Sequence, residues 1–177
     1  MSLIRVIAVA MLCATLFAAS PMPAQQAAAP NPLDVVPEKM SFDIPYGTPI
    51  SLEQAQAAIQ AAVAEAQKRG WKFNVAVVDS GANLVAFQRM DGAQLASIAI
   101  SQHKARAAAI FRRETKVWES VVFSGNNTPI TLDGVIASRG GIPLIVGGKL
   151  VGAIGCSGGT SSQDEVACKV GAAVINK

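Results

Sequence analysis

The single histidine of the chain, His103, can take part in more kinds of chemistry than any other residue. It lies in the middle of an alanine-rich stretch typical of a helix, with Ala99 and Ala107 four residues away on either side. One histidine cannot build a zinc site, and the cysteines stand at no zinc spacing. It can supply the one axial nitrogen that a heme iron needs. The alternative is a surface or packed helical histidine without a ligand.

A second group of candidates surrounds the stretch "FQRMDGA" at a predicted strand end. Side chains alternate along a strand, so Arg89 and Met90 face opposite sides and Arg89 shares its face with Asp91. The two charges form either a structural pair or a site in which Arg89 holds a substrate carboxylate bidentately. Met90 is either a core side chain or a second axial ligand. Arg139, followed by two glycines, offers another cation beside flexible backbone.

The stretch "GAIGCSGGTSSQDE" is a glycine-rich passage from an apolar strand into a helix. A helix start presents free N–H groups and a partial positive charge that can hold a carboxylate or phosphate. Ser157 and Thr160 add hydroxyl donors, but the lysine of a P-loop is missing. The alternative is a plain junction, capped by Ser161 or Ser162, in which the two acids that follow already satisfy the helix dipole.

Periodic apolar patterns predict the elements that must position these residues. Helical spacing and a capping box of Ser51 and Gln54 indicate the first helix, and β-branched apolar runs indicate strands. The predicted order is helix 51–70, strands 73–79 and 84–90, helix 94–111, a shorter helix 112–123, a short strand within 135–141, a hairpin 142–158 that turns at Gly147-Gly148, and helix 163–177.

This order predicts an α+β fold, because tight turns make neighbouring strands antiparallel and helices then cover the faces of the sheet. Arg112 and Arg113 follow the second long helix, where solvent and the helix dipole both suit their charge. We therefore interpret this arginine pair as a solvated helix end.

The composition excludes several classes of protein. The chain has 177 residues, 51% hydrophobic and 15% charged, which suits one domain with a real core and excludes disorder over most of its length. The basic residues are scattered and the formal net charge is only +3, so no nucleic-acid-binding face is predicted. The one histidine would have to serve any catalytic triad, so the sequence gives little support for a hydrolase.

The beginning of the chain has the layout of a secretory signal peptide, with Arg5, an apolar run of 14 residues and then Ser, Pro and Ala. The run is short for a bilayer span, so no stable membrane insertion is expected and the protein is predicted to be periplasmic or secreted. The predicted division is a signal peptide at 1–24, a Pro/Ala-rich leader and extended arm at 25–50, and one domain at 51–177. Cys156 and Cys168 remain after cleavage, as a disulfide or as two buried thiols.

Several motifs together resemble one known family. The stretches "VAVVDSGANLVAFQRMDGA", "HKARAAAIFRRET", "RGGIPLIVGGKLVGAIGCSGGTSSQDE" and "ACKVGA" occur in the same order as in the GlcG/HbpS family, which includes the C-terminal domain of a class of corrinoid adenosyltransferases. The resemblance covers about residues 50–177. It implies a profilin-like three-layer domain, with a five-stranded antiparallel sheet flanked by helices, and a homo-oligomer.

The resemblance also implies an exported heme-binding (tetrapyrrole-binding) protein that acts in heme uptake, sensing or degradation. Thr115 looks like a family position implicated in iron contact, whereas the family usually has no histidine where His103 stands. The candidate metal ligands are thus His103 and Thr115, and the candidate residues for the heme propionates are Arg89, Arg139, Ser157 and Thr160.

Two other functions remain open at this point. One is a small cofactor-free enzyme or binding protein for a small organic (hydroxy)acid, with Arg89 as carboxylate clamp and Asp91 or Lys104 in acid–base chemistry. The other is an assembly module without a ligand. The glycine-rich loop is expected to be chiefly a strand-to-helix junction, near a site or interface formed between subunits.

Overall fold

The computed structural model describes residue 31 and residues 34–177. The chain divides into two units, Met1–Glu38 and Lys39–Lys177. The predicted signal peptide lies outside the described residues, and its cleavage stays a prediction. In the part of the chain that is described, no helix is long and apolar enough to cross a membrane.

The second unit contains four α-helices, one short 3-10 helix and four strands, close to the predicted order. Their bounds are α1 Leu52–Lys68, β1 Asn74–Asp79, β2 Leu84–Arg89, α2 Ala96–Ile110, α3 Lys116–Phe123, η2 Thr128–Thr131, β3 Gly141–Val146, β4 Lys149–Ser157 and α4 Ser161–Ala173.

The four strands form one antiparallel sheet in the order β2-β1-β4-β3. The α+β class is confirmed, but the described residues contain four strands rather than the expected five. The stretch 135–140 forms no strand. One reason is that the backbone N–H of Arg139 donates to the carboxylate of Glu119 at 2.9 Å, so it is not available to a strand neighbour. Gly140 then turns the chain with a φ of 112°.

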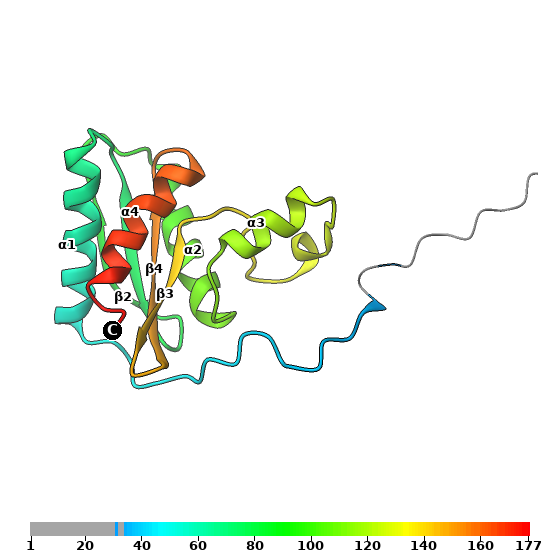
Figure 1. Ribbon diagram of the computed structural model, residues 1–177. Coiled ribbons are helices and arrows are strands. Elements are labelled where there is room, and N and C mark those ends of the chain that lie inside the picture. The colour runs from blue at the N-terminus through cyan, green and yellow to red at the C-terminus, as the bar shows by residue number, and fades with distance from the viewer. Residues whose placement is uncertain (1–30, 32–33) are drawn as a thin grey trace, which may run out of the picture. The chain divides into compact units, whose positions relative to one another are not determined.

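Helices cover both faces of the sheet (Figure 1). On one face, α1 and α4 pack on Val75 and Val77 of β1, and on the other the alanines of α2 pack on Ala76 and Val78. Helix α2 lies unusually close to the sheet, since a Cβ on Gly155 would be only 2.0 Å from the carbonyl oxygen of a residue of α2. The alternation of β1 side chains therefore supplies two separate cores.

A disulfide joins the sheet to one of its covering helices. Cys156 of β4 is bonded to Cys168 of α4, with a Cα–Cα distance of 5.6 Å, and both residues are fully buried. Of the two alternatives left open by the sequence, the structure has the disulfide.

Residues 45–50 run along the β3–β4 hairpin before the first helix starts. The amide of Leu150 donates to Pro45 at 2.8 Å, that of Gly47 donates to Leu150 at 2.7 Å, and Tyr46 forms an isolated parallel bridge with Leu150. The phenol of Tyr46 donates to the Ile110 carbonyl at 2.8 Å. This segment is thus attached to β4 and to the end of α2.

Candidate functional site

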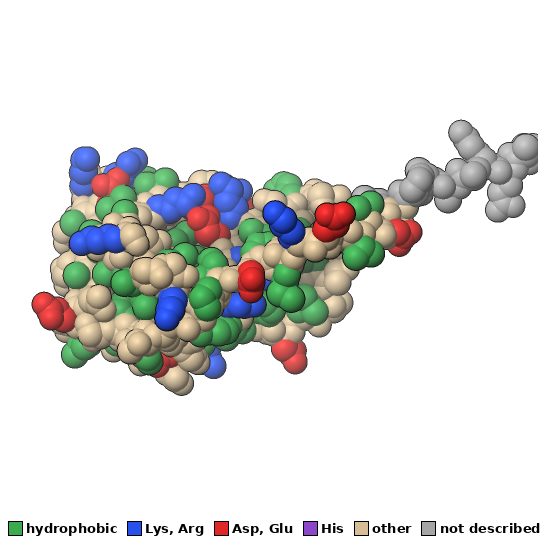
Figure 2. Space-filling model, turned by 60° about the horizontal axis from the view of Figure 1, so that its bottom comes forward, with side chains coloured by type: hydrophobic (Ala, Val, Ile, Leu, Met, Phe, Trp, Pro, Cys, Tyr) green, Lys and Arg blue, Asp and Glu red, His purple; other side chains and the backbone are tan. Residues whose placement is uncertain are grey.

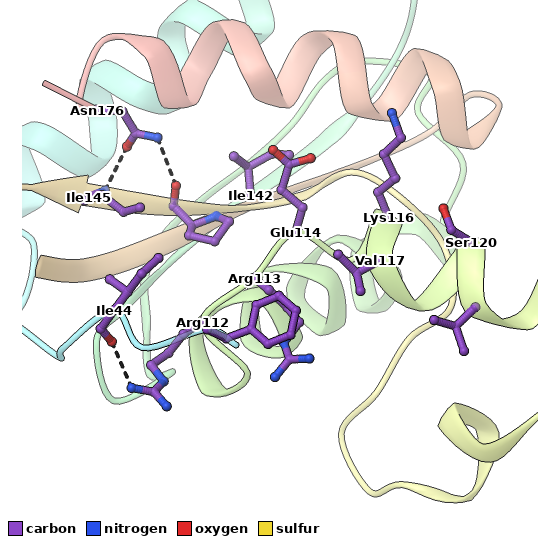
Figure 3. A pocket seen from close by; sticks show the side chains of 13 residues that line it. Ile44, Arg112, Arg113, Glu114, Lys116, Val117, Ser120, Ile142, Ile145 and Asn176 are labelled. Carbon is purple, nitrogen blue, oxygen red and sulfur yellow. Dashed lines mark hydrogen bonds between the residues drawn. The ribbon is translucent and has the colours of Figure 1, made fainter. Parts of the chain in front are cut away.

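A cavity of about 640 Å³ lies where residues 42–44, the turn after α2, the start of α3 and β3 meet (Figure 3). Its walls are mainly apolar. The apolar lining residues are Phe42, Ile44, Val117, Val121, Ile142, Pro143 and Ile145. The amide of Asn176 holds the end of the chain against this wall, accepting from the N–H of Ile145 at 2.8 Å and donating to the carbonyl of Pro143 at 3.2 Å.

Two adjacent arginines supply the positive charge of this cavity. Arg112 donates to the carbonyl of Ile44 at 2.9 Å, and its guanidinium stands 5.4 Å from the ring of Tyr46. The guanidinium of Arg113 lies 3.4 Å from the ring of Phe42 and 4.7 Å from that of Trp118. In the described part of the chain, neither arginine forms an ion pair with a carboxylate.

The environment of Arg113 is unfavourable for its charge. Burial lowers the pKa of its guanidinium, and the neighbouring charge of Arg112 lowers it further. Two like charges beside an apolar space, with ring and carbonyl partners only, are stabilised by an anion that reaches both. The cavity therefore has the chemistry to bind an apolar molecule that carries carboxylates.

The backbone at this cavity has unusual conformations. Phe42 has a φ of 67° and Arg112 a φ of 53°, and both values lie in the left-handed region that L-residues rarely adopt. Only three non-glycine residues in the described chain have positive φ, and two of them meet here. Such conformations persist only where surrounding contacts enforce them, and they cluster at ligand sites.

The other charges near the cavity neutralise one another. Arg139 contacts Glu119 at 2.8 Å and Glu165 at 3.2 Å, and Lys116 contacts Glu165 at 3.1 Å. Lys169 contacts Glu165 at 2.6 Å and Glu114, which lines the cavity, at 3.6 Å. Burial alone raises the pKa of Glu119, but hydrogen bonds from Arg139 and its charge outweigh this, so the pKa lies below its ordinary value. Hydrogen bonds from the two lysines likewise outweigh the burial of Glu165 and lower its pKa.

The structure places Arg139 in this ion cluster, with its guanidinium already paired. Thr115 is fully buried, and its hydroxyl accepts a hydrogen bond from the amide of Gly141 at 2.9 Å. It stands between two lining residues of the cavity without lining the cavity itself. Its predicted contact with iron remains a prediction.

The glycine-rich loop is a strand-to-helix junction in this single chain. Thr160, rather than Ser161 or Ser162, is the N-cap of α4, and it forms a capping box with Gln163. The S/T-x-x-Q pattern was present in the sequence and could have predicted this. The hydroxyl of Ser157 is buried and donates to that of Ser97 at 3.0 Å.

Arg89 and His103 lie in two further hollows. Arg89 is exposed in a groove of about 550 Å³ with Trp71, Lys72 and Asp91, and no ion pair between Arg89 and Asp91 is found among the described residues. His103 is exposed on α2 in a hollow of about 530 Å³. The six candidate residues therefore do not converge on one place.

Two other candidate residues have structural partners. Met90 packs against the core, and its sulfur accepts a hydrogen bond from the amide of Phe73 at 3.3 Å. Lys104 is buried in an ion pair with Asp164 at 2.7 Å, so its ammonium cannot reach a substrate in the groove of Arg89.

Sequence reasoning missed the residues that line the cavity of about 640 Å³, which is called the main cavity below. The sequence predicts a solvated helix end at Arg112 and Arg113, but the structure buries part of both between rings and carbonyls. The alternation of apolar Phe42 and Ile44 with polar neighbours in an extended, proline-rich segment was the one available signal.

Comparison with known proteins gives the chain its family. Residues 50–173 match the family model described as "Haem degrading protein HbpS-like". The chain belongs to the HbpS-like family. The match covers the helices and strands of the second unit, so the predicted resemblance is confirmed.

Several known proteins are similar to this chain in sequence or in structure. The protein GlcG of Escherichia coli K12 is 42% identical over 108 residues, which is 61% of this chain and 81% of that protein. A double mutant of HbpS from Streptomyces reticuli, solved by crystallography, is 28% identical with a TM-score of 0.67, covering 85% of this chain and all of that one. PduOC, solved as a heme complex, is 28% identical with a TM-score of 0.66, covering 73% and 96%.

Proposed function

We propose that this chain is an exported heme-binding protein and that the cavity beside Arg112 and Arg113 holds the tetrapyrrole. The observation that carries the proposal is an apolar cavity of about 640 Å³ next to two arginines that have no carboxylate partner in the described residues. Heme is a planar apolar ring with two carboxylates, so it needs this combination of walls and cations. The chain's membership of the HbpS-like family also supports the proposal, as does the heme complex of the similar protein PduOC.

The residues present fit the ring and its carboxylates. Ile44, Val117 and Ile142 supply apolar contact for the ring, and the two guanidiniums supply donors for the propionates. Heme would bring a redox-active iron to this place. Among the described residues, those that line the cavity include no histidine, methionine or cysteine, so recognition there rests on the ring and the carboxylates. Uptake, sensing and degradation of heme all begin with this binding step.

Export is the second part of the proposal. The buried disulfide supports it, because structural disulfides form and persist in oxidising compartments such as the periplasm or the extracellular space. Together with the predicted signal peptide, it favours a periplasmic or secreted protein. On the face seen in Figure 2, lysine and arginine side chains are interspersed with acidic and hydrophobic ones.

The test is a titration of the protein with hemin, in which the Soret absorption band reports binding. A titration with metal-free protoporphyrin is run in parallel. We expect saturable, stoichiometric binding of both, because the cavity recognises the ring and its carboxylates. Arg113→Gln should weaken hemin binding by about tenfold or more, as the loss of a charge-assisted hydrogen bond predicts. No saturable binding of hemin to the wild-type chain would overturn the proposal.

A matched pair of variants decides where the heme lies. Arg106 lines the hollow of His103, and Arg113 is not among the residues that line this hollow. If heme occupies the main cavity, Arg106→Gln and His103→Ala leave the affinity and the Soret band unchanged. A changed Soret band in His103→Ala would instead support the prediction that His103 is an iron ligand and would move the site to that hollow.

A further inference from the structure

Phe42 covers the cavity through its contact with Arg113. Its ring lies 3.4 Å from the guanidinium, and Trp118 lies on the same guanidinium at 4.7 Å. The Nε of Arg113 donates to the carbonyl of Phe111 at 3.0 Å. Since a guanidinium carries five N–H donors in one plane, Arg113 can bind a carboxylate at its edge and keep its ring contacts.

The segment that carries Phe42 is attached much more firmly at one end than at the other. Residues 45–50 form backbone hydrogen bonds of 2.7–2.8 Å with Leu150 and Val151 of β4. Residues 41–44 are held by the bond from Arg112 to the Ile44 carbonyl and by the stacking of Phe42. Residues 39–41 are exposed. The position of residues 41–44 therefore depends on Arg112 and Arg113, the same two arginines that would hold the carboxylates of a ligand.

The backbone conformation of Phe42 adds to this dependence. A φ of 67° is rare for a residue with a bulky side chain, and it is kept only while the surrounding contacts enforce it. If the side chain of Arg113 moved, the ring of Phe42 would lose its main contact, and residues 41–44 would then leave the cavity.

We propose that residues 41–44 form a strap that closes over the bound ligand, and that Phe42 stacks on the ligand's planar ring. This inference rests on the proposed function and adds a selectivity to it. The strap makes the site selective for planar aromatic dicarboxylates over flexible apolar ones, because only a flat ring offers a face to Phe42. Closure of the strap and binding of the ligand then strengthen each other by the same factor.

Variants at position 42 test the stacking. Phe42→Ala should weaken hemin binding by roughly tenfold, whereas Phe42→Tyr, which keeps the ring, should bind as the wild type does. Leu95→Ala removes another exposed apolar side chain, away from the cavity, and should have no effect. Binding of hexadecanedioic acid, which has two carboxylates and no ring, should weaken less in Phe42→Ala than hemin binding does, because an alkyl chain loses apolar contact but no stacking.

Limited proteolysis tests the closure itself. Lys39 is exposed and stands three residues before Phe42, so trypsin must engage the strap to cleave after it. Saturating hemin should slow this cleavage severalfold in the wild type and much less in Phe42→Ala. A small peptide substrate in the same tube controls for direct inhibition of trypsin by hemin.

The outcomes separate the two proposals. If hemin binds the wild type but Phe42→Ala binds it equally well, or hemin leaves cleavage after Lys39 unchanged, the strap is wrong and the proposed function stands. If the wild type does not bind hemin at all, both fail. A circular-dichroism melt of Phe42→Ala that matches the wild type shows that the loss is not one of folding.

Discussion

At the scale of single residues, Thr115 shows how one hydroxyl can have a structural and a proposed functional role. It is fully buried, and it accepts the amide hydrogen of Gly141, the first residue of β3. The amide of Thr115 in turn donates to the carbonyl of Gly141 at 3.0 Å. This two-way contact ties the start of α3 to the edge of the sheet beside the cavity.

We predict that Thr115→Val destabilises the protein by about 1–3 kcal/mol, because the isosteric change leaves the buried amide of Gly141 without an acceptor. Urea unfolding measures this. Thr48→Val at an exposed position is the control and should change the free energy of unfolding by less than about 0.5 kcal/mol. A hemin spectrum that changes in Thr115→Val while stability does not would instead favour the predicted iron contact.

At the scale of elements, two connections hold α4 in place. The disulfide fixes it to β4 inside the core. The ion cluster of Glu119, Glu165, Arg139 and the two lysines fixes it to α3 and to the loop before β3. Helix α3 has no buried residue of its own in the single chain, so this cluster is a main part of its attachment.

The cluster predicts a pH dependence. The pKa of Glu119 and that of Glu165 are below the ordinary value of 4.5 in the folded state. A lowered pKa contributes stability that is present above pH 4.5 and is lost as the pH falls through the folded-state pKa. The stability advantage of wild type over Glu119→Gln should therefore be largest near pH 7 and shrink below pH 4.5.

The measurement is the free energy of unfolding of both proteins across this pH range. The difference between them is informative because Asp164 acts in the opposite direction: burial raises its pKa despite the charge of Lys104. That contribution is common to both proteins and cancels in the difference. A difference that stays constant from pH 7 to pH 3 would contradict the role given to Glu119.

At the scale of the whole molecule, the segment of α3 and η2 projects from the sheet layers (Figure 1). It carries the exposed apolar residues Phe123, Ile130 and Leu132, with Phe123 87% exposed. A second copy of the chain would cover these side chains, which supports the predicted homo-oligomer.

We predict that the wild-type chain is a homo-oligomer and that Phe123→Glu lowers its mass, because a charge in a buried apolar contact is costly. Light scattering after size exclusion gives the mass. Val35→Glu, which charges an exposed apolar position of the first unit, should leave it unchanged. A wild-type mass equal to one chain would show that this surface has another role.

The sequence alone determined the parts of this protein that depend on neighbouring residues. The capping box at Ser51, the hairpin turn at Gly147-Gly148 and the periodic helices all depend on contacts within a few residues, and the structure has them. The order of the four sequence motifs along the chain also identified the family, because together they span the whole domain.

Tertiary structure decided what depends on residues far apart in the chain. One reason that residues 135–140 form no strand is the hydrogen bond from the amide of Arg139 to Glu119, twenty positions away. The candidate cavity joins Phe42 to Arg113 and to β3, and no local pattern reports that three distant segments meet there. A helix or turn is specified by its own side chains, whereas a cavity is the space that several packed elements leave between them.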